Sequence, residues 1–210
     1  MGPATFTADV PLAAAALRRG AVVAYPTETF YGLGALATLP AAVARLGEAK
    51  LRPDGKPLPL VAADEGMAFG LWDGVPPAAL VLARAFWPGP LTLVARAVQG
   101  LPDPVSLGGT VAVRVPGSAQ ARELCRLAGG PLVSTSANPS GGPPPVEAGG
   151  LDPWLLARID LVLDGGRTPG GLPSTVVEVG DGAPRLLRAG AVPWSVLEGV
   201  LRSLLPSRGG

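Results

Sequence analysis

The two lysines of the chain lie in one short segment that is otherwise rich in turn-forming residues. Lys50 and Lys56 flank Arg52 in residues 50–57 (KLRPDGKP), although the chain has 15 arginines and only these 2 lysines. A lysine ammonium is a compact point charge and an arginine guanidinium is a planar fork, so the two are not interchangeable. Clustered cations of both kinds suit the phosphates of a nucleotide. A solvated basic loop is the plain alternative, and the clustering of the lysines favours the phosphate role.

Hydroxyl and amide side chains gather in two further segments. Residues 25–34 (YPTETFYGLG) contain Glu28 and Thr29, and residues 134–141 (STSANPSG) contain Asn138, the only asparagine of the chain. The glycines of such segments let backbone amides approach a ligand closely. Many short donors and acceptors with little apolar content are typical of a loop that binds a small polar ligand. For the first segment, a turn that satisfies Glu28 is the structural alternative.

Three more candidates lie in segments with strand character. Arg114 comes near the end of residues 110–115 (TVAVRV), where valines alternate around it. An arginine at that place either pairs within the protein or holds the carboxylate of a ligand. Ser174 and Arg188 follow in two later apolar segments, and each alone is a weak signal.

Several catalytic classes are excluded by what the chain lacks. It has no histidine and a single cysteine, Cys125. Histidine triads, histidine zinc sites and histidine general bases are therefore absent, and Cys125 fits a small core residue on the apolar face of a helix. Hydroxyls, cations and glycines together indicate a site that orients substrates and stabilises phosphate charge, as nucleotidyl transfer requires.

Alternating strands and helices must position these segments. Apolar runs bounded by turn residues predict strands at residues 21–25, 58–63, 91–97, 110–115, 131–136, 160–166, 174–179 and 184–190. Helical spacing, caps and stops predict helices at residues 9–20, 40–49, 64–72, 76–86, 118–130 and 193–205. Residues 25–34 are expected to form a loop. The interleaving predicts a single α+β domain over residues 1–210, with a twisted mixed β-sheet flanked by helices.

The overall composition is that of a globular protein. Of the 210 residues 48% are hydrophobic and 16% charged, and the net charge is +1, so the total charge requires neither nucleic acid nor a membrane surface. Asp9 before the apolar N-terminal run and arginines after it favour a helix over a secretory signal. We expect a cytoplasmic protein with no membrane association.

Seven segments occur in the order found in YrdC-like proteins, and as an ordered set they are highly specific. They are YPTETFYGLG, AKLRPDGKPLPLV, FWPGPLTLV, TVAVRVPG, STSANPSG, PSTVVEV and LLRAGAV. The chain thus resembles this family from about residue 20 to residue 191, in its short bacterial TsaC-type form. The resemblance implies a YrdC/RibB-like fold with a concave, positively charged cleft.

The resemblance also implies an activity, L-threonylcarbamoyladenylate synthesis. The amine of L-threonine would capture CO2 or bicarbonate as a carbamate, which would attack the α-phosphate of ATP and release pyrophosphate. A tRNA-modifying threonylcarbamoyl transferase complex would then move the threonylcarbamoyl group to adenosine 37 of tRNA. Mg²⁺ would arrive with ATP rather than at a metal site of the protein.

Two sets of site residues follow from the resemblance. Four would contact threonine, with the Arg114 guanidinium on its carboxylate: Thr29, Arg114, Ser134 and Ser174. Seven would surround ATP: Lys50, Arg52, Lys56, Thr110, Ser136, Asn138 and Arg188. Lys50 and Arg52 form the KxR motif and are expected to act catalytically at the phosphates. The chain departs from the family pattern at Phe30, Val61 and Pro144, where relatives often carry an aliphatic residue, a histidine and a polar residue.

Two other functions remain as alternatives. A YrdC-like RNA-binding module without catalysis would act in tRNA or ribosome maturation, and it would need a broad basic face with aromatic side chains for stacking. Aromatic residues make up only 5% of this chain, which favours the enzyme. A carbamoyl-transfer domain of the hydrogenase-maturation type resembles the same fold but is usually accompanied by zinc-finger and acylphosphatase-like parts.

Overall fold

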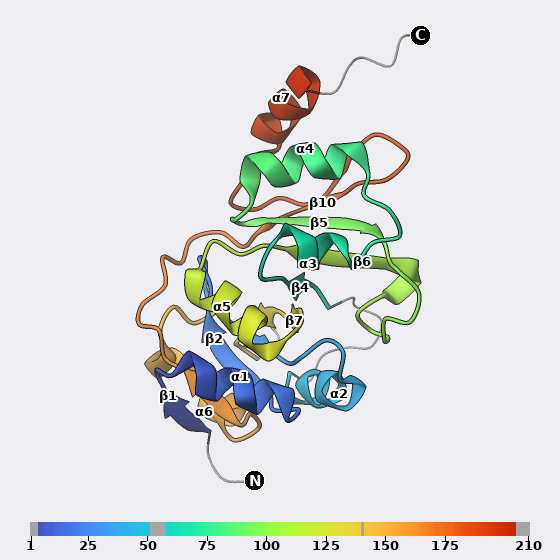
Figure 1. Cartoon of the computed structure of the whole chain (residues 1–210). Helices are drawn as coiled ribbons and strands as arrows, with labels where there is room; N and C mark the ends of the chain where they lie inside the picture. The colour runs from blue at the N-terminus through green and yellow to red at the C-terminus, as the bar shows by residue number, and fades with distance from the viewer. Residues whose placement is uncertain (1–3, 51–57, 140, 205–210) are drawn as a thin grey trace.

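The protein folds into helices and strands arranged around two β-sheets (Figure 1). The structure is a computed structural model that describes residues 4–50, 58–139 and 141–204. The helices of the described residues are α1 Val10–Arg18, α2 Pro40–Ala49, α3 Glu65–Phe69, α4 Pro77–Phe86, α5 Ala119–Ala128, α6 Pro153–Leu156 and α7 Trp194–Leu204. The strands are β1 Thr5–Thr7, β2 Val23–Pro26, β3 Tyr31–Gly34, β4 Leu60–Val61, β5 Leu91–Arg96, β6 Thr110–Arg114, β7 Leu132–Val133, β8 Thr135–Ser136, β9 Leu161–Leu163, β10 Thr175–Glu178 and β11 Arg185–Arg188.

The strands form two mixed sheets that meet along one edge. The first has the order β1-β9-β2-β3-β8 and the second the order β11-β10-β5-β6-β4-β7. Where they meet, Leu36 bridges Leu132 and the Val133 amide donates to the Ala35 carbonyl at 2.9 Å. The α+β class is therefore confirmed, although the strands divide into two sheets instead of one.

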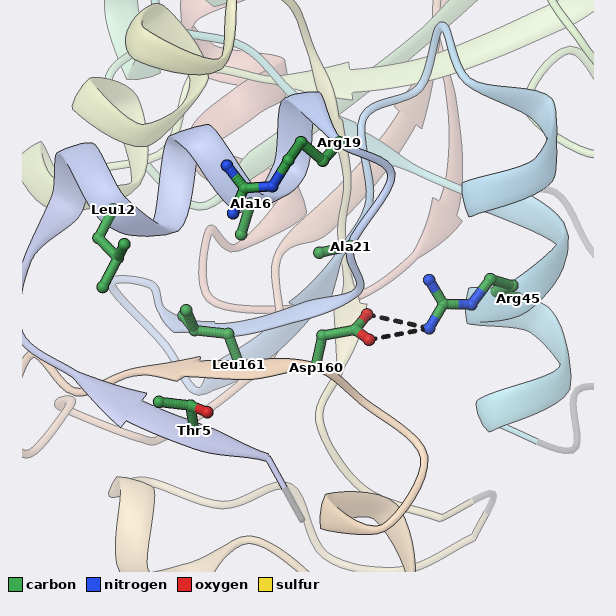
Figure 2. A pocket seen from close by; sticks show the side chains of 8 residues that line it. All are labelled: Thr5, Leu12, Ala16, Arg19, Ala21, Arg45, Asp160 and Leu161. Carbon is green, nitrogen blue, oxygen red and sulfur yellow. Dashed lines mark hydrogen bonds and ion pairs between the residues drawn. The ribbon is translucent and has the colours of Figure 1, made fainter. Parts of the chain in front are cut away.

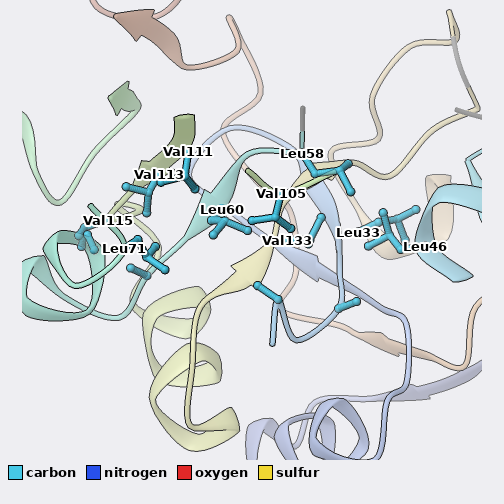
Figure 3. Packing of buried hydrophobic residues seen from close by; sticks show 14 of the residues in the cluster. Leu33, Leu46, Leu58, Leu60, Leu71, Val105, Val111, Val113, Val115 and Val133 are labelled. Atoms are coloured by element: carbon cyan, nitrogen blue, oxygen red, sulfur yellow. The ribbon is translucent and has the colours of Figure 1, made fainter. Parts of the chain in front are cut away.

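Helices cover both sheets on their apolar faces. Helix α4 packs on β5 and carries α7 on its outer side, whereas α1 and α5 pack together against β2 (Figure 1). Leu33, Leu60 and Val113 come from three different strands and belong to one buried cluster, in which all three are at most 1% exposed (Figure 3). The core therefore extends from one sheet into the other and fixes their relative position.

Strand β6 shows how the alternation of the sequence positions the site. Val111 and Val113 are fully buried, whereas Thr110, Ala112 and Arg114 are half-buried on the opposite face. Successive side chains of a strand point to opposite faces, so the valines anchor the strand in the core. Arg114 consequently lies on the opposite, half-buried face of the strand.

The expectation of a loop throughout residues 25–34 is wrong. Tyr31–Gly34 form strand β3, which pairs antiparallel with β2. A Cβ atom at Gly34 would lie 2.6 Å from Cε1 of the buried Tyr25 ring, so glycine here makes room for a ring rather than for a ligand. Strand β1 and helix α6 also lie outside the predicted elements. They have three and four residues respectively, and such short elements carry too little of a hydrophobic pattern to be predicted.

Candidate functional site

The turn between β2 and β3 is built around a threonine hydroxyl. Thr27 Oγ1 accepts hydrogen bonds from the amides of Thr29 at 3.2 Å and Phe30 at 3.3 Å, and it donates to the Phe30 carbonyl at 2.7 Å. The Thr29 carbonyl accepts the Gly170 amide at 2.7 Å. Hydroxyl side chains that bond to their own turn fix its backbone. The turn therefore holds Glu28 and Thr29 in defined positions.

Glu28 and Arg114 form a buried ion pair whose hydrogen bonding is incomplete. Glu28 Oε1 lies 3.3 Å from Arg114 Nε, and the two side chains are only 15% and 11% exposed. Both carboxylate oxygens of Glu28, and Nε of Arg114, are buried without a hydrogen-bond partner in the described part of the chain. Each such group costs about 1–3 kcal/mol, and more when charged. Unsatisfied buried groups of this kind are expected where a ligand completes the bonding.

A second guanidinium lies near this pair. Arg188 donates from Nε and Nη2 to the Ser174 carbonyl at 3.2 and 2.8 Å, and from Nη2 to Ser174 Oγ at 3.0 Å. Ser174 Oγ lies 2.9 Å from Thr92 Oγ1 on β5. Partial burial lowers the pKa of Arg188, and the positive charge of Arg114 lowers it further. Two positive charges thus share one region, which is favourable for an anionic ligand.

Lys50 connects helix α2 with the polar segment that follows β8. Its Nζ atom donates to the carbonyls of Ser136 at 2.6 Å and Asn138 at 2.7 Å. Asn138 Nδ2 in turn donates to the carbonyls of Pro139 and Gly142, and its Oδ1 atom is buried without a partner in the described residues. The plain alternative of a solvated basic loop does not hold for Lys50, because this residue caps α2 and is only 5% exposed.

The remaining predicted residues are spread more widely. Ser134 is buried beside the Tyr25 ring, whereas Ser136 is exposed on β8. Thr110 begins β6 and Arg114 ends it, so they lie about 13 Å apart at roughly 3.3 Å per residue. Arg52 and Lys56 lie outside the described residues. The structure therefore joins Thr29, Arg114, Ser174 and Arg188 around one region, and it joins Lys50, Ser136 and Asn138 around another.

Two residues contribute more than the sequence indicated. Glu28 appears in the sequence only as one polar residue of a presumed loop, and Thr92 is not singled out at all. The sequence feature that indicates Glu28 is its position two residues after the buried strand β2, because a charged side chain there stays next to the core. For Thr92, a hydroxyl inside the otherwise apolar strand β5 is the corresponding signal.

A cavity among the described residues lies at the other edge of the first sheet. It encloses about 410 Å³ beside Ala21 and Leu161, at the beginnings of β2 and β9 (Figure 2). Arg45 Nη2 contacts both oxygens of Asp160 at 3.0 Å, and Asp160 also accepts the Val22 amide at 2.7 Å. These polar groups satisfy one another, so we assign them to holding α2 against the sheet and not to chemistry.

Comparison with known proteins identifies the family. The sequence model of the Sua5, YciO and YrdC family, described as "Telomere recombination", matches residues 15–190. The chain belongs to this family. It is 40% identical over 193 residues to a threonylcarbamoyl-AMP synthase of Pyrococcus abyssi and 39% identical over 203 residues to one of Bacillus subtilis. These alignments cover 91% and 96% of this chain but 57% and 59% of those relatives, so the chain spans less than two thirds of their length.

Solved structures of the family share the fold. P. abyssi Sua5 complexed with L-threonine matches with a TM-score of 0.85 and 38% identity, covering 95% of this chain and 60% of that chain. E. coli YciO matches with a TM-score of 0.75 and 25% identity, covering 92% and 98%. A threonylcarbamoyl-AMP synthase of Xanthomonas campestris is 43% identical over 167 residues, which cover 76% of this chain and 87% of that relative.

The family departures have different positions in the structure. Val61 is fully buried in β4, and its carbonyl contacts Cys125 Sγ at 3.5 Å. Phe30 is half-buried in the turn that carries Thr29, and Pro144 is half-buried in the segment after Asn138. Among the described residues, no group of three potential metal-ligating side chains is present and no helix is long and apolar enough to cross a membrane.

Proposed function

We propose that this protein is an L-threonylcarbamoyladenylate synthase. Its substrates are L-threonine, CO2 or bicarbonate, and ATP bound to Mg²⁺. Its products are threonylcarbamoyl-AMP and pyrophosphate, together with one water molecule when bicarbonate is the carbon source. In the proposed reaction an oxygen of the threonine carbamate forms a bond to the α-phosphorus of ATP. The bond from that phosphorus to the bridging oxygen breaks, and pyrophosphate leaves with the electron pair.

The observation that carries the proposal is the incompletely bonded ion pair beside Thr29. The Arg114 side chain is only 11% exposed, and the single ionic contact it makes in the described residues is with Glu28 at 3.3 Å. A carboxylate ligand would supply the charged acceptor that such a guanidinium binds most strongly. Ser134 and Ser174 complete the proposed threonine site with hydroxyl groups, and Thr29 contributes a third. The Sua5 structure with L-threonine, which shares this fold, is consistent with the same ligand.

The proposed ATP site extends from this region over the polar segments. Arg188 faces the α-phosphate beside the threonine site, and Lys50 maintains the backbone of residues 136–138 through its two carbonyl contacts. Ser136, Asn138 and Thr110 belong to this site, and Arg52 and Lys56 add the cations predicted from the sequence. Fixed positive charges aimed at the developing charge of the transferring phosphoryl group are the main source of catalysis in such reactions.

Magnesium enters as part of the nucleotide substrate in this proposal. Mg²⁺ commonly keeps several waters and binds through phosphates with one or two carboxylates. The proposal further places the protein in the cytoplasm, where a threonylcarbamoyl transferase complex would consume the product for tRNA modification, with direct tRNA contact as an additional feature.

Pyrophosphate release tests the proposal directly. With MgATP and bicarbonate, we expect release that depends on L-threonine and falls when glycine replaces it. The control reaction omits bicarbonate and traps residual CO2, because carbamate formation should then limit the rate. ATP binding without threonine-dependent release would contradict the synthase and support the RNA-binding alternative, which a tRNA binding assay would then examine.

A further inference from the structure

We infer that Glu28 binds the α-ammonium group of the amino-acid substrate, so that Glu28 and Arg114 together recognise both charges of a zwitterion. The inference rests on the proposed function, since it assigns a role within the same site. It assigns Glu28 a role in substrate binding, which neither the sequence motif nor the ion pair with Arg114 indicates by itself.

The position of the carboxylate supports this role. Glu28 Oε1 faces Arg114 Nε at 3.3 Å, and Oε2 is buried without any hydrogen bond in the described residues. The same part of the chain accepts no hydrogen bond from the Arg114 guanidinium. An amino acid carries its ammonium and carboxylate on one carbon, so adjacent opposite charges on the protein match it. The ammonium would contact Glu28, and the carboxylate would contact the terminal nitrogens of Arg114.

The surrounding structure keeps Glu28 in this position. A Cβ atom on Gly117 would lie 3.1 Å from Glu28 Cβ, so the backbone of the segment after β6 packs closely against the side chain. On the other side, the hydroxyl of Thr27 fixes the turn that carries Glu28. A side chain held in this way is preorganised for a ligand, because little conformational freedom is lost on binding.

A structural ion pair in the same protein shows the contrast. Asp160 contacts Arg45 through both oxygens at 3.0 Å and also accepts the Val22 amide at 2.7 Å. Ion pairs that stabilise a fold usually have their remaining hydrogen-bonding groups satisfied. Glu28 is more buried than Asp160, with 15% against 34% of its side chain exposed, and yet it accepts no hydrogen bond in the described residues. The difference points to a ligand as the missing partner.

The test compares two ligands that differ only in the ammonium group. Isothermal titration calorimetry would measure binding of L-threonine and of its α-hydroxy analogue, 2,3-dihydroxybutanoate of the same stereochemistry, to the wild-type protein. We expect threonine to bind at least about tenfold more tightly, which corresponds to about 1.4 kcal/mol. Equal affinities would overturn the inference without any variant, whereas binding of neither ligand would contradict the proposed function itself.

Variants then assign the preference to Glu28. In Glu28→Gln we expect the preference for threonine over the hydroxy analogue to shrink to about threefold or less. The matched control is Asp160→Asn, which makes the same chemical change in the structural pair and should keep the wild-type preference. Thermal unfolding of each variant identifies one that fails to fold, in which case the wild-type ligand comparison decides. A folded Glu28→Gln protein that weakens both ligands equally would make Glu28 a structural residue only.

Discussion

Replacing Lys50 by methionine removes an ammonium group and keeps most of the aliphatic side chain. In the folded protein this ammonium donates to two backbone carbonyls, at 2.6 and 2.7 Å, and the residue is only 5% exposed. A hydrogen bond to a charged group contributes about 1.5–3 kcal/mol, and the cost of burying the ammonium offsets part of the sum for two. We therefore expect Lys50→Met to lower the free energy of unfolding by about 2–4 kcal/mol.

Urea denaturation followed by circular dichroism would measure this loss, because the midpoint and slope give the free energy by linear extrapolation. Arg84→Met is the matched control, since Arg84 is exposed on α4, and we expect its effect to stay within about 0.5 kcal/mol. An unchanged free energy of unfolding in Lys50→Met would refute the reasoning that this lysine maintains the backbone of residues 136–138. The ammonium would then act on the substrate alone.

Three further predictions concern the stability of the fold. Gly34→Ala places a Cβ atom 2.6 Å from the Tyr25 ring, so thermal unfolding should show a loss of about 1–3 kcal/mol, and a wild-type melting temperature would contradict this packing. Arg45→Leu should lower the free energy of unfolding by about 1 kcal/mol while threonine affinity stays unchanged in calorimetry; lost affinity would assign the cavity of Figure 2 to the site. Burial raises the pKa of Tyr25, and it raises the pKa of Cys125 to about 12. Both groups ionise more readily in the unfolded chain, so stability should be fully present below about pH 8 and fall as the pH rises above about 9; a flat urea midpoint across that range would contradict this.

Most elements of the fold follow from patterns that are local in the sequence. The helix over residues 118–130 has a serine cap and a glycine stop, and the structure ends α5 at a left-handed Gly129 as expected. Strand β3 could not be predicted in the same way, because Tyr31–Gly34 contain two glycines that usually indicate a turn. They form a strand through their pairing with β2, and Gly34 leaves room for the Tyr25 ring, a contact between two strands that exists only in the folded hairpin.

The residue types of the site can be predicted from the sequence, whereas their arrangement in space is much harder to predict. Lysine and asparagine are rare in this chain, and this rarity indicates Lys50 and Asn138 as candidates. The hydrogen bond from the Lys50 ammonium to the Asn138 carbonyl, however, joins residues 88 positions apart and forms only on folding. The two tyrosines of the chain both lie beside residues 27–30. Tyr25 is fully buried, and Tyr31 donates to the Gly166 carbonyl at 2.8 Å, so both support the turn from within the fold.

Mass spectrometry of the reaction product tests the central claim most directly. The purified protein would be incubated with MgATP, L-threonine and ¹³C-bicarbonate, and the products separated at once. We predict a threonine-dependent adduct of AMP that carries one ¹³C atom, formed in equal amount with pyrophosphate. An unlabelled threonyl adduct, or ATP consumption without an adduct that contains threonine, would contradict the proposed synthase.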